Sequence, residues 1–338
     1  MVILSGEYLC FDDVLLVPQY SDIESRKNVE IRTNIAGICL SVPIISANMD
    51  TITEEHMARA IREAGGLGIL HRYSDEKKLY EQIYYLEKHN IAIVPSLGVN
   101  EEDREKAENL FDTCGKVIDA VCLDVAHGDH RKVSEMVGVL KQNFQVKVIA
   151  GNVATYEGAC RLADAGADVI KIGVGPGSLC TTRLITGHGI PQLSAIMEVA
   201  NIKPKYLGIQ LIADGGIRYS GDIVKALAAG ADAVMIGRLL AGCWETPGKV
   251  VGGKKLYRGS ASFSAQMDHD GFVHNGTPEG ESTFVPAKGS VKDIIAGLAG
   301  GIRSGLSYSG ALSIKDLQES AMFIKVSNNT ILENGVRL

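Results

Sequence analysis

Eight short apolar runs, separated by helical segments, constrain the fold of this chain more than any other feature. Each run is bounded by glycine, proline or polar residues, and stretches with helical periodicity lie between the runs. Continuous apolar strands that alternate with amphipathic helices are typical of a parallel sheet covered by helices. The predicted strands are residues 42–46, 66–70, 91–94, 120–124, 146–150, 168–172, 209–213 and 233–236.

Eight such units predict a (β/α)8 TIM barrel, one domain over residues 1–338. A doubly wound open sheet is disfavoured because no Gly-x-Gly-x-x-Gly sequence follows the first strand with an acid about 20 positions later. Residues 1–40 form a leader that we expect to pack across the barrel base, without site residues. Residues 242–289 have weak periodicity, which predicts a mobile flap without regular structure after strand eight.

The composition excludes several classes of function. The net charge of -6 argues against nucleic acid or an anionic membrane as the main partner. No apolar run approaches the roughly 20 residues that cross a bilayer. The seven cysteines include no Cys-x-x-Cys pair, which argues against a disulfide scaffold or a zinc module. The first residues lack the basic region of a signal peptide, so we expect a cytoplasmic protein.

A single thiol lies in a glycine-rich loop directly after the sixth predicted strand. The loop reads Gly173-Val-Gly-Pro-Gly-Ser-Leu-Cys-Thr-Thr-Arg183, and its thiol is Cys180. Glycines let the backbone approach a ligand closely, and the neighbours of the thiol are hydroxyls and a guanidinium. Reactive cysteines occupy polar, electropositive and partly open sites, whereas structural ones are buried. We therefore predict that Cys180 is a nucleophile.

Polar and glycine-rich segments also follow strands seven and eight. In many barrels these two loops bind phosphate through backbone N–H groups. Serine hydroxyls from the cysteine loop and from the flap are expected to contribute, and an arginine after strand eight adds a cationic contact. The residues predicted here are Ser178, Asp214, Gly215, Gly216, Gly237, Arg238 and Ser262.

The cysteine loop resembles the sequence pattern of the IMP dehydrogenase / GMP reductase family. Residues 11–16, 46–49, 150–153 and 213–218 match the same family, and the resemblance runs from about residue 8 to the final helix. It implies a purine nucleoside monophosphate whose C2 is attacked by the cysteine to give a thioimidate. It also implies a nicotinamide cofactor, a homotetramer and, in dehydrogenases, a monovalent cation such as K+ on carbonyls of the cysteine loop. The matching cation positions are Gly175, Gly177 and Cys180.

The resemblance assigns further roles. Asp214 matches the carboxylate that holds the ribose hydroxyls. Ser260 stands where the family usually has a methionine that contacts the base, so we expect altered base contacts there. The cofactor-binding positions implied by the family are Arg72, Asp124, Gly151, Asn152 and Tyr308.

Between the two activities of the family, the flap favours GMP reductase, which converts GMP and NADPH to IMP and ammonia. Residues 267–279 contain no adjacent Arg-Tyr pair, the pair with which dehydrogenases activate water. Hydrolysis of the thioimidate needs a general base within reach of the attacking water, and the flap lacks the pair that provides it in dehydrogenases. Thr182 and Glu279 occupy the positions with which reductases handle ammonia. The alternative is an IMP dehydrogenase without the regulatory insert, which oxidises IMP to XMP with NAD.

Two other classes of function remain as alternatives. An aldolase-type barrel requires a Schiff-base lysine, and Lys171 is the strand candidate, although it lies mid-strand. A nucleotide-sensing regulator would be expected to lose the nucleophile. His269, on the flap, is expected to be a solvated side chain.

Overall fold

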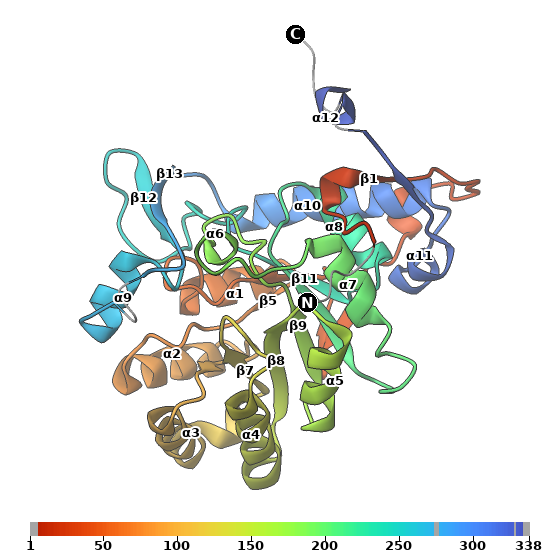
Figure 1. Cartoon of the computed structure of the whole chain (residues 1–338). Coiled ribbons are helices and arrows are strands. Elements are labelled where there is room, and N and C mark those ends of the chain that lie inside the picture. The colour runs from red at the N-terminus through yellow and green to blue at the C-terminus, as the bar shows by residue number, and fades with distance from the viewer. Residues whose placement is uncertain (1–5, 274–276, 328, 334–338) are drawn as a thin grey trace.

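The structure, a computed structural model, describes residues 6–273, 277–327 and 329–333, and its main body is one curved parallel sheet surrounded by helices (Figure 1). The two end strands of this sheet meet through a parallel bridge between Leu70 and Pro95, which closes the barrel. The predicted (β/α)8 barrel is therefore confirmed. In spatial order the strands are β5 (Leu67–Gly68), β4 (Ile44–Ser46), β11 (Ala233–Ile236), β10 (Gln210–Asp214), β9 (Val169–Ile172), β8 (Lys147–Val153), β7 (Ala120–Asp124) and β6 (Ser96–Leu97).

The third predicted strand is displaced. The prediction over residues 91–94 is wrong, because regular pairing begins only at β6, after Pro95. Residues 93–95 still lie in the barrel wall, where the Val94 carbonyl accepts the N–H of Leu70 at 2.9 Å. Proline has no N–H to donate to a ladder, so the regular strand starts after it.

Helices on the outside of the barrel connect successive strands. In α1 (Glu55–Glu63), Met57, Ala58 and Ile61 are buried against the sheet. A Cβ at Gly68 of β5 would lie 2.4 Å from the Ala58 Cα, so the close approach of helix and strand requires glycine there. The other outer helices are α2 (Glu76–Lys88), α3 (Glu101–Cys114), α4 (Arg131–Val139), α5 (Tyr156–Asp164), α7 (Gln192–Ala200), α8 (Ser220–Ala228) and α10 (Val291–Tyr308), which follows the flap. The short α6 (Thr182–Thr186) belongs to the loop after β9.

The leader covers the base of the barrel. Its hairpin, β2 (Thr33–Ile35) and β3 (Ile38–Leu40), buries Ile35 and Leu40 in a core shared with side chains of the barrel strands. Further towards the N-terminus, β1 (Val14–Leu16) pairs with β14 (Phe323–Lys325), which follows α11 (Ile314–Ser320) and precedes α12 (Asn329–Glu333).

The flap has regular structure, contrary to our expectation. Antiparallel strands β12 (Lys254–Arg258) and β13 (Ser282–Pro286) form its arms, and α9 (Phe263–Asp270) lies beside them at one side of the barrel (Figure 1). The inward residues of β12 include Lys255, whose ammonium donates to the Cys243 and Thr246 carbonyls. Because a charged residue, Lys255, occupies an inward position of β12, the alternation of apolar and polar residues that indicates a strand is hidden in the sequence.

Across the described part of the chain, none of the helices combines the length and the apolar character that crossing a bilayer requires.

Candidate active site

Cys180 lies exposed at the mouth of the barrel, at the start of a directed chain of hydrogen bonds. Its thiol donates to the Thr182 hydroxyl at 3.2 Å, and that hydroxyl donates to the Glu279 carboxylate at 2.8 Å. The three residues predicted to be catalytic are therefore connected, although Glu279 is 97 positions from Thr182 in the chain. The arrangement provides a route for the thiol proton to a carboxylate.

The flap segment before β13 holds the cysteine loop by backbone hydrogen bonds. The Thr181 N–H donates to the Glu279 carbonyl at 3.1 Å, and the Glu281 N–H donates to the Leu179 carbonyl at 2.9 Å. On the other side, the Glu279 N–H donates to the Ala261 carbonyl at 3.1 Å. Glu279 is thus positioned by its own backbone between the cysteine loop and the segment before α9.

Glycines allow two strand-end loops to meet beneath the thiol. Gly215 has φ +91°, and a Cβ there would lie 3.1 Å from the Gly177 nitrogen. Gly175 has φ +85°, and a Cβ there would lie 2.6 Å from the Arg183 Cγ. Both positions need a residue that adopts positive φ and has no side chain.

A cavity of about 290 Å³ opens on one side of these loops. Ser178 forms a 3.0 Å hydrogen bond with the hydroxyl of Tyr257 in its wall. Tyr257 is an additional site residue that sequence reasoning missed, and its signal was the alternation of β12. Residues 10–12 of the leader also reach this wall, where we expected no site residues. Of the predicted substrate-binding residues, the cavity brings together Ser178, Asp214, Gly215, Gly216, Gly237 and Arg238.

A larger cavity of about 1040 Å³ adjoins the first and contains Cys180 and Thr182 in its wall. The two cavities share Gly177 and Asp214, so the thiol lies near their junction. The wall continues to the loops after β5 and β7, to β8 and to the first turn of α3. It includes the predicted cofactor-binding residues Arg72, Asp124 and Asn152, together with Ser260 of the flap.

Lys171 points into the barrel from β9 and connects the carboxylates of the site. Its ammonium lies 2.9 Å from Asp214 and 3.8 Å from Asp124, and its side chain is only 3% exposed. Burial alone lowers the pKa of Lys171, but the two carboxylates outweigh burial and raise it. A Schiff-base lysine must lose its proton, so this raised pKa argues against the aldolase alternative.

Asn152 completes this interior cluster. Its side-chain amide donates to the Gly173 carbonyl at 2.8 Å and to Asp214 at 2.9 Å. Its Oδ1 atom is buried and has no hydrogen-bond partner among the described residues. An acceptor left without a donor in the cavity wall fits a ligand that carries an amide N–H.

Four predicted residues line neither cavity. Glu279 is one of them, and it is connected to the larger cavity through its hydrogen bond with Thr182. The hydroxyl of Ser262 instead caps α9, where it accepts the Ala265 N–H at 3.3 Å, so a phosphate contact is not supported. Gly151 lies behind the wall, where a Cβ would be 2.5 Å from the Lys171 carbonyl. Tyr308 is exposed at the end of α10, with the Arg26 guanidinium 5.9 Å from its ring.

The carbonyls predicted to hold a monovalent cation are partly engaged. The Gly177 carbonyl accepts the Cys180 N–H at 3.1 Å, which leaves it one lone pair for a cation. The cation on Gly175, Gly177 and Cys180 stays a prediction. Within residues 6–273, 277–327 and 329–333, no group of three or more His, Cys, Asp or Glu side chains could hold a metal ion.

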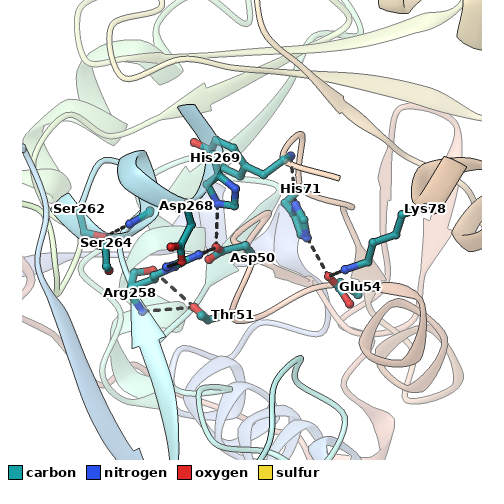
Figure 2. Close-up of polar contacts among 12 residues, drawn as sticks. Asp50, Thr51, Glu54, His71, Lys78, Arg258, Ser262, Ser264, Asp268 and His269 are labelled. Atoms are coloured by element: carbon teal, nitrogen blue, oxygen red, sulfur yellow. Dashed lines mark hydrogen bonds and ion pairs between the residues drawn. The ribbon is translucent and has the colours of Figure 1, made fainter. Parts of the chain in front are cut away.

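The expectation for His269 is wrong, because this side chain belongs to a charge cluster at the mouth. Its Nε2 lies 2.9 Å from the carboxylate of Asp50 (Figure 2). Its ring stacks on Tyr73, with centroids 4.3 Å apart. Arg72 and Tyr73 form an adjacent Arg-Tyr pair, but on the loop after β5 and not on the flap. Burial raises the pKa of Tyr73 to about 12, so its phenol stays protonated at neutral pH.

Comparisons with known proteins agree with this geometry. Residues 8–337 match the model of the IMP dehydrogenase / GMP reductase domain. The inosine-5'-monophosphate dehydrogenase of Aquifex aeolicus is 35% identical, over 95% of this chain and 93% of that protein. The GMP reductase of Leishmania major is 32% identical, over 97% of this chain and 96% of that protein. A solved structure of GMP reductase from Trypanosoma brucei in complex with guanosine 5'-monophosphate covers 98% of both chains, with a TM-score of 0.90 and 29% identity.

The internal segments that this chain lacks do not distinguish a dehydrogenase from a reductase. The alignments with the Aquifex dehydrogenase and the Leishmania reductase extend over 459 and 479 positions, although this chain has 338 residues. A relative of each kind therefore carries internal segments that are absent here. With its barrel, its cysteine loop and a family match over nearly its whole length, the chain belongs to the IMP dehydrogenase / GMP reductase family of oxidoreductases.

Proposed function

We propose that this protein is an NADPH-dependent GMP reductase that converts GMP to IMP and ammonia. The observation that supports it best is the pair of hydrogen bonds that connects the Cys180 thiol through Thr182 to Glu279. Deamination needs a nucleophile for C2 and a proton for the leaving nitrogen, and these three residues supply both. The solved neighbour that holds guanosine 5'-monophosphate supports a purine nucleoside monophosphate as substrate.

In the deamination step the Cys180 sulfur forms a bond to C2 of the base while its proton passes through Thr182 to Glu279. The bond between C2 and the 2-amino nitrogen then breaks, and the same proton returns to the nitrogen, which leaves as ammonia. The product is a thioimidate on Cys180, and Glu279 is again a carboxylate. Covalent catalysis of this kind divides one difficult displacement into two easier steps.

The two cavities divide the binding task. In the smaller cavity, Ser178, Tyr257 and Arg238 surround the position proposed for the phosphate, and Asp214 is proposed to accept the ribose hydroxyls. In the larger cavity, Arg72, Asp124 and Asn152 are proposed to hold the dinucleotide. When bound, NADPH supplies the hydride that replaces sulfur at C2. The volume of the larger cavity and the partnerless Asn152 Oδ1 fit such a ligand.

The dehydrogenase alternative needs a base for water. The described flap residues contribute no arginine or tyrosine to the larger cavity. Tyr73 lies in that cavity, but its raised pKa keeps it a poor proton acceptor at neutral pH. This arrangement favours transfer of hydride to the thioimidate over its hydrolysis.

The test mixes purified protein with GMP and NADPH and, separately, with IMP and NAD, and follows absorbance of the reduced dinucleotide. Oxidation of NADPH that depends on GMP, with ammonia released in equal amount, supports the reductase. Reduction of NAD that depends on IMP, with XMP as product, replaces it by the dehydrogenase. No reaction in either mixture favours the nucleotide-sensing regulator.

A further inference from the structure

Apolar packing does not account for the position of α9. In this helix Ala265 and Gln266 are buried, but the large side chains Phe263 and Met267 are 60% and 42% exposed. A helix with so little buried apolar surface is weakly held by hydrophobic contacts. Polar contacts at its C-terminal half must supply the rest.

Those contacts converge on one carboxylate, Asp50, in the loop after β4 (Figure 2). Its Oδ2 accepts from Arg258 Nε at 2.9 Å and from Arg258 Nη2 at 2.5 Å, and it accepts from His269 Nε2 at 2.9 Å. Arg258 also reaches Asp268 of α9 through Nη1, at 2.5 Å. The nearly buried carboxylate of Asp50 thus joins the loop after β4 to β12 and to α9, and Asp268 adds a direct contact between α9 and β12.

Asp50 remains charged in this cluster. Burial alone raises its pKa, but the hydrogen bonds from His269 and Arg258 outweigh burial and hold the pKa below its usual value. A carboxylate only accepts hydrogen bonds, so His269 must carry a proton on Nε2. Its Nδ1 forms no hydrogen bond within the part of the chain that the structure describes.

The same imidazole connects the cluster to the wall of the larger cavity. His269 stacks on Tyr73 with an angle of 13° between the rings, and the Arg72 guanidinium lies 4.6 Å from the Tyr73 centroid. All three side chains line that cavity. His269 therefore contacts both the charge cluster, through Nε2, and the cavity wall, through its ring.

We infer that His269 is a positioning residue for the dinucleotide. Its hydrogen bond to Asp50 fixes α9 and Tyr73 against the half of the larger cavity that lies beyond Cys180. The inference rests on the proposed function in one respect, because it takes this half as the place where the second substrate binds. The nucleotide in the smaller cavity does not depend on it, since His269 lines only the larger one.

Three variants separate the contributions. His269→Gln keeps an N–H donor at a similar reach, whereas His269→Phe keeps a ring for Tyr73 and removes the donor. Asp268→Asn is the matched control, because Asp268 is the adjacent residue of the same helix, is 65% exposed, and as asparagine keeps a side-chain oxygen that can accept from Arg258. The fluorescence of NADPH, titrated in the presence of IMP, gives the dissociation constant of the dinucleotide without turnover. Steady-state assays give KM for GMP.

We expect His269→Phe to weaken NADPH binding by about 10-fold to 100-fold, the range for a lost hydrogen bond to a charged group. The NADPH dissociation constant of His269→Gln should stay within about threefold of that of the unmodified protein, and that of Asp268→Asn within about twofold. A donor to Asp50 is kept in both variants. KM for GMP changes by less than about threefold in all three, since the smaller cavity is untouched. Circular dichroism and the thermal midpoint check that each variant is folded.

Unchanged NADPH binding in His269→Phe would overturn the inference, as would equal losses in His269→Phe and Asp268→Asn. An equal loss of GMP and NADPH binding would show a general structural role and would also overturn it. If the protein instead reduces NAD with IMP, the titration is repeated with NADH in the presence of XMP. A selective loss in His269→Phe then supports the positioning role while the reductase proposal fails. Binding of neither dinucleotide by the unmodified protein would refute both.

Discussion

Two charge clusters lie at the mouth of the barrel, and they are held in different ways. Lys171, Asp214 and Asp124 belong to the wall strands β9, β10 and β7, and β8 lies between β9 and β7, so the ladders of one sheet fix their register. Asp50, Arg258 and His269 come from the loop after β4 and from the flap, and no ladder joins that loop to α9. The barrel therefore positions the first cluster, whereas the second cluster itself positions part of the flap.

The comparison predicts which properties each region controls. Disrupting the barrel cluster leaves partly buried carboxylates without a compensating charge and should lower the stability of the whole molecule. Disrupting the flap cluster should release a weakly packed segment and leave the barrel folded. The nucleophile lines the same cavity as residues of both clusters, and its loss should affect turnover without affecting stability.

The largest effect is expected for Cys180→Ala. Loss of the nucleophile should lower kcat by about 10⁴-fold or more, because no covalent intermediate can form. The dissociation constant for GMP, measured by equilibrium binding, and the thermal midpoint should change little. Substantial residual turnover would refute covalent catalysis by Cys180, and a large loss of stability would place the thiol in the barrel core.

Lys171→Met should have the largest effect on stability. Removing one partner of a buried ion pair leaves the other charge without compensation, which costs about 3 kcal/mol in the free energy of unfolding. Urea unfolding measures this loss. Lys315→Met is the control, because its ion pair with Glu319 is exposed and should contribute less than about 0.5 kcal/mol. Equal losses in the two variants would contradict the distinction between the barrel cluster and the surface.

Thr182→Val tests the connection between the barrel and the flap. It removes the hydroxyl between Cys180 and Glu279 with little change of shape. Positioned proton transfer contributes about 100-fold or more, so kcat should fall by that factor while KM for GMP stays within about threefold. Thr182→Ser, which restores a hydroxyl, should recover most of the activity. A serine variant as slow as the valine variant would point to packing rather than proton transfer.

The sequence predicts those features of the fold and the site that depend on a local pattern of residues. The barrel follows from the apolar strand period, and the position of Cys180 follows from glycines within a few residues of it. Contacts between distant segments leave no such pattern: Asp50 and His269 are 219 positions apart, and their pairing could not be predicted. Lys171 interrupts an apolar run, and only the fold shows that Asp214 and Asp124 compensate its charge. Tyr257 was missed because the buried Lys255 conceals the strand that carries it.

Asp50→Asn should loosen the flap without unfolding the barrel. At pH 7 we expect hydrogen exchange of the α9 amides to show a loss of about 2 kcal/mol in local stability, since hydrogen bonds to a charge are lost. The pKa of Asp50 is lowered in the folded protein, so its contribution is present above the pKa of the unfolded chain. The contribution disappears as the pH falls through the lower folded pKa. The difference between Asp50→Asn and the unmodified protein should therefore shrink in acid. A difference that grows in acid would contradict this sign.

The smallest effect is expected on the outer surface, where Glu63 pairs with Arg59 and Lys292. Hydrogen bonds from Lys292 and Arg59 lower the pKa of Glu63 to about 2, which by itself suggests a strong interaction. The side chain is 37% exposed, however, so water and salt screen the charges. We expect Glu63→Gln to lower the free energy of unfolding by at most about 0.5 kcal/mol, and the loss should vanish in about 1 M salt. A larger loss that persists in salt would show that charge pairs outside the two clusters also hold α1 against α10.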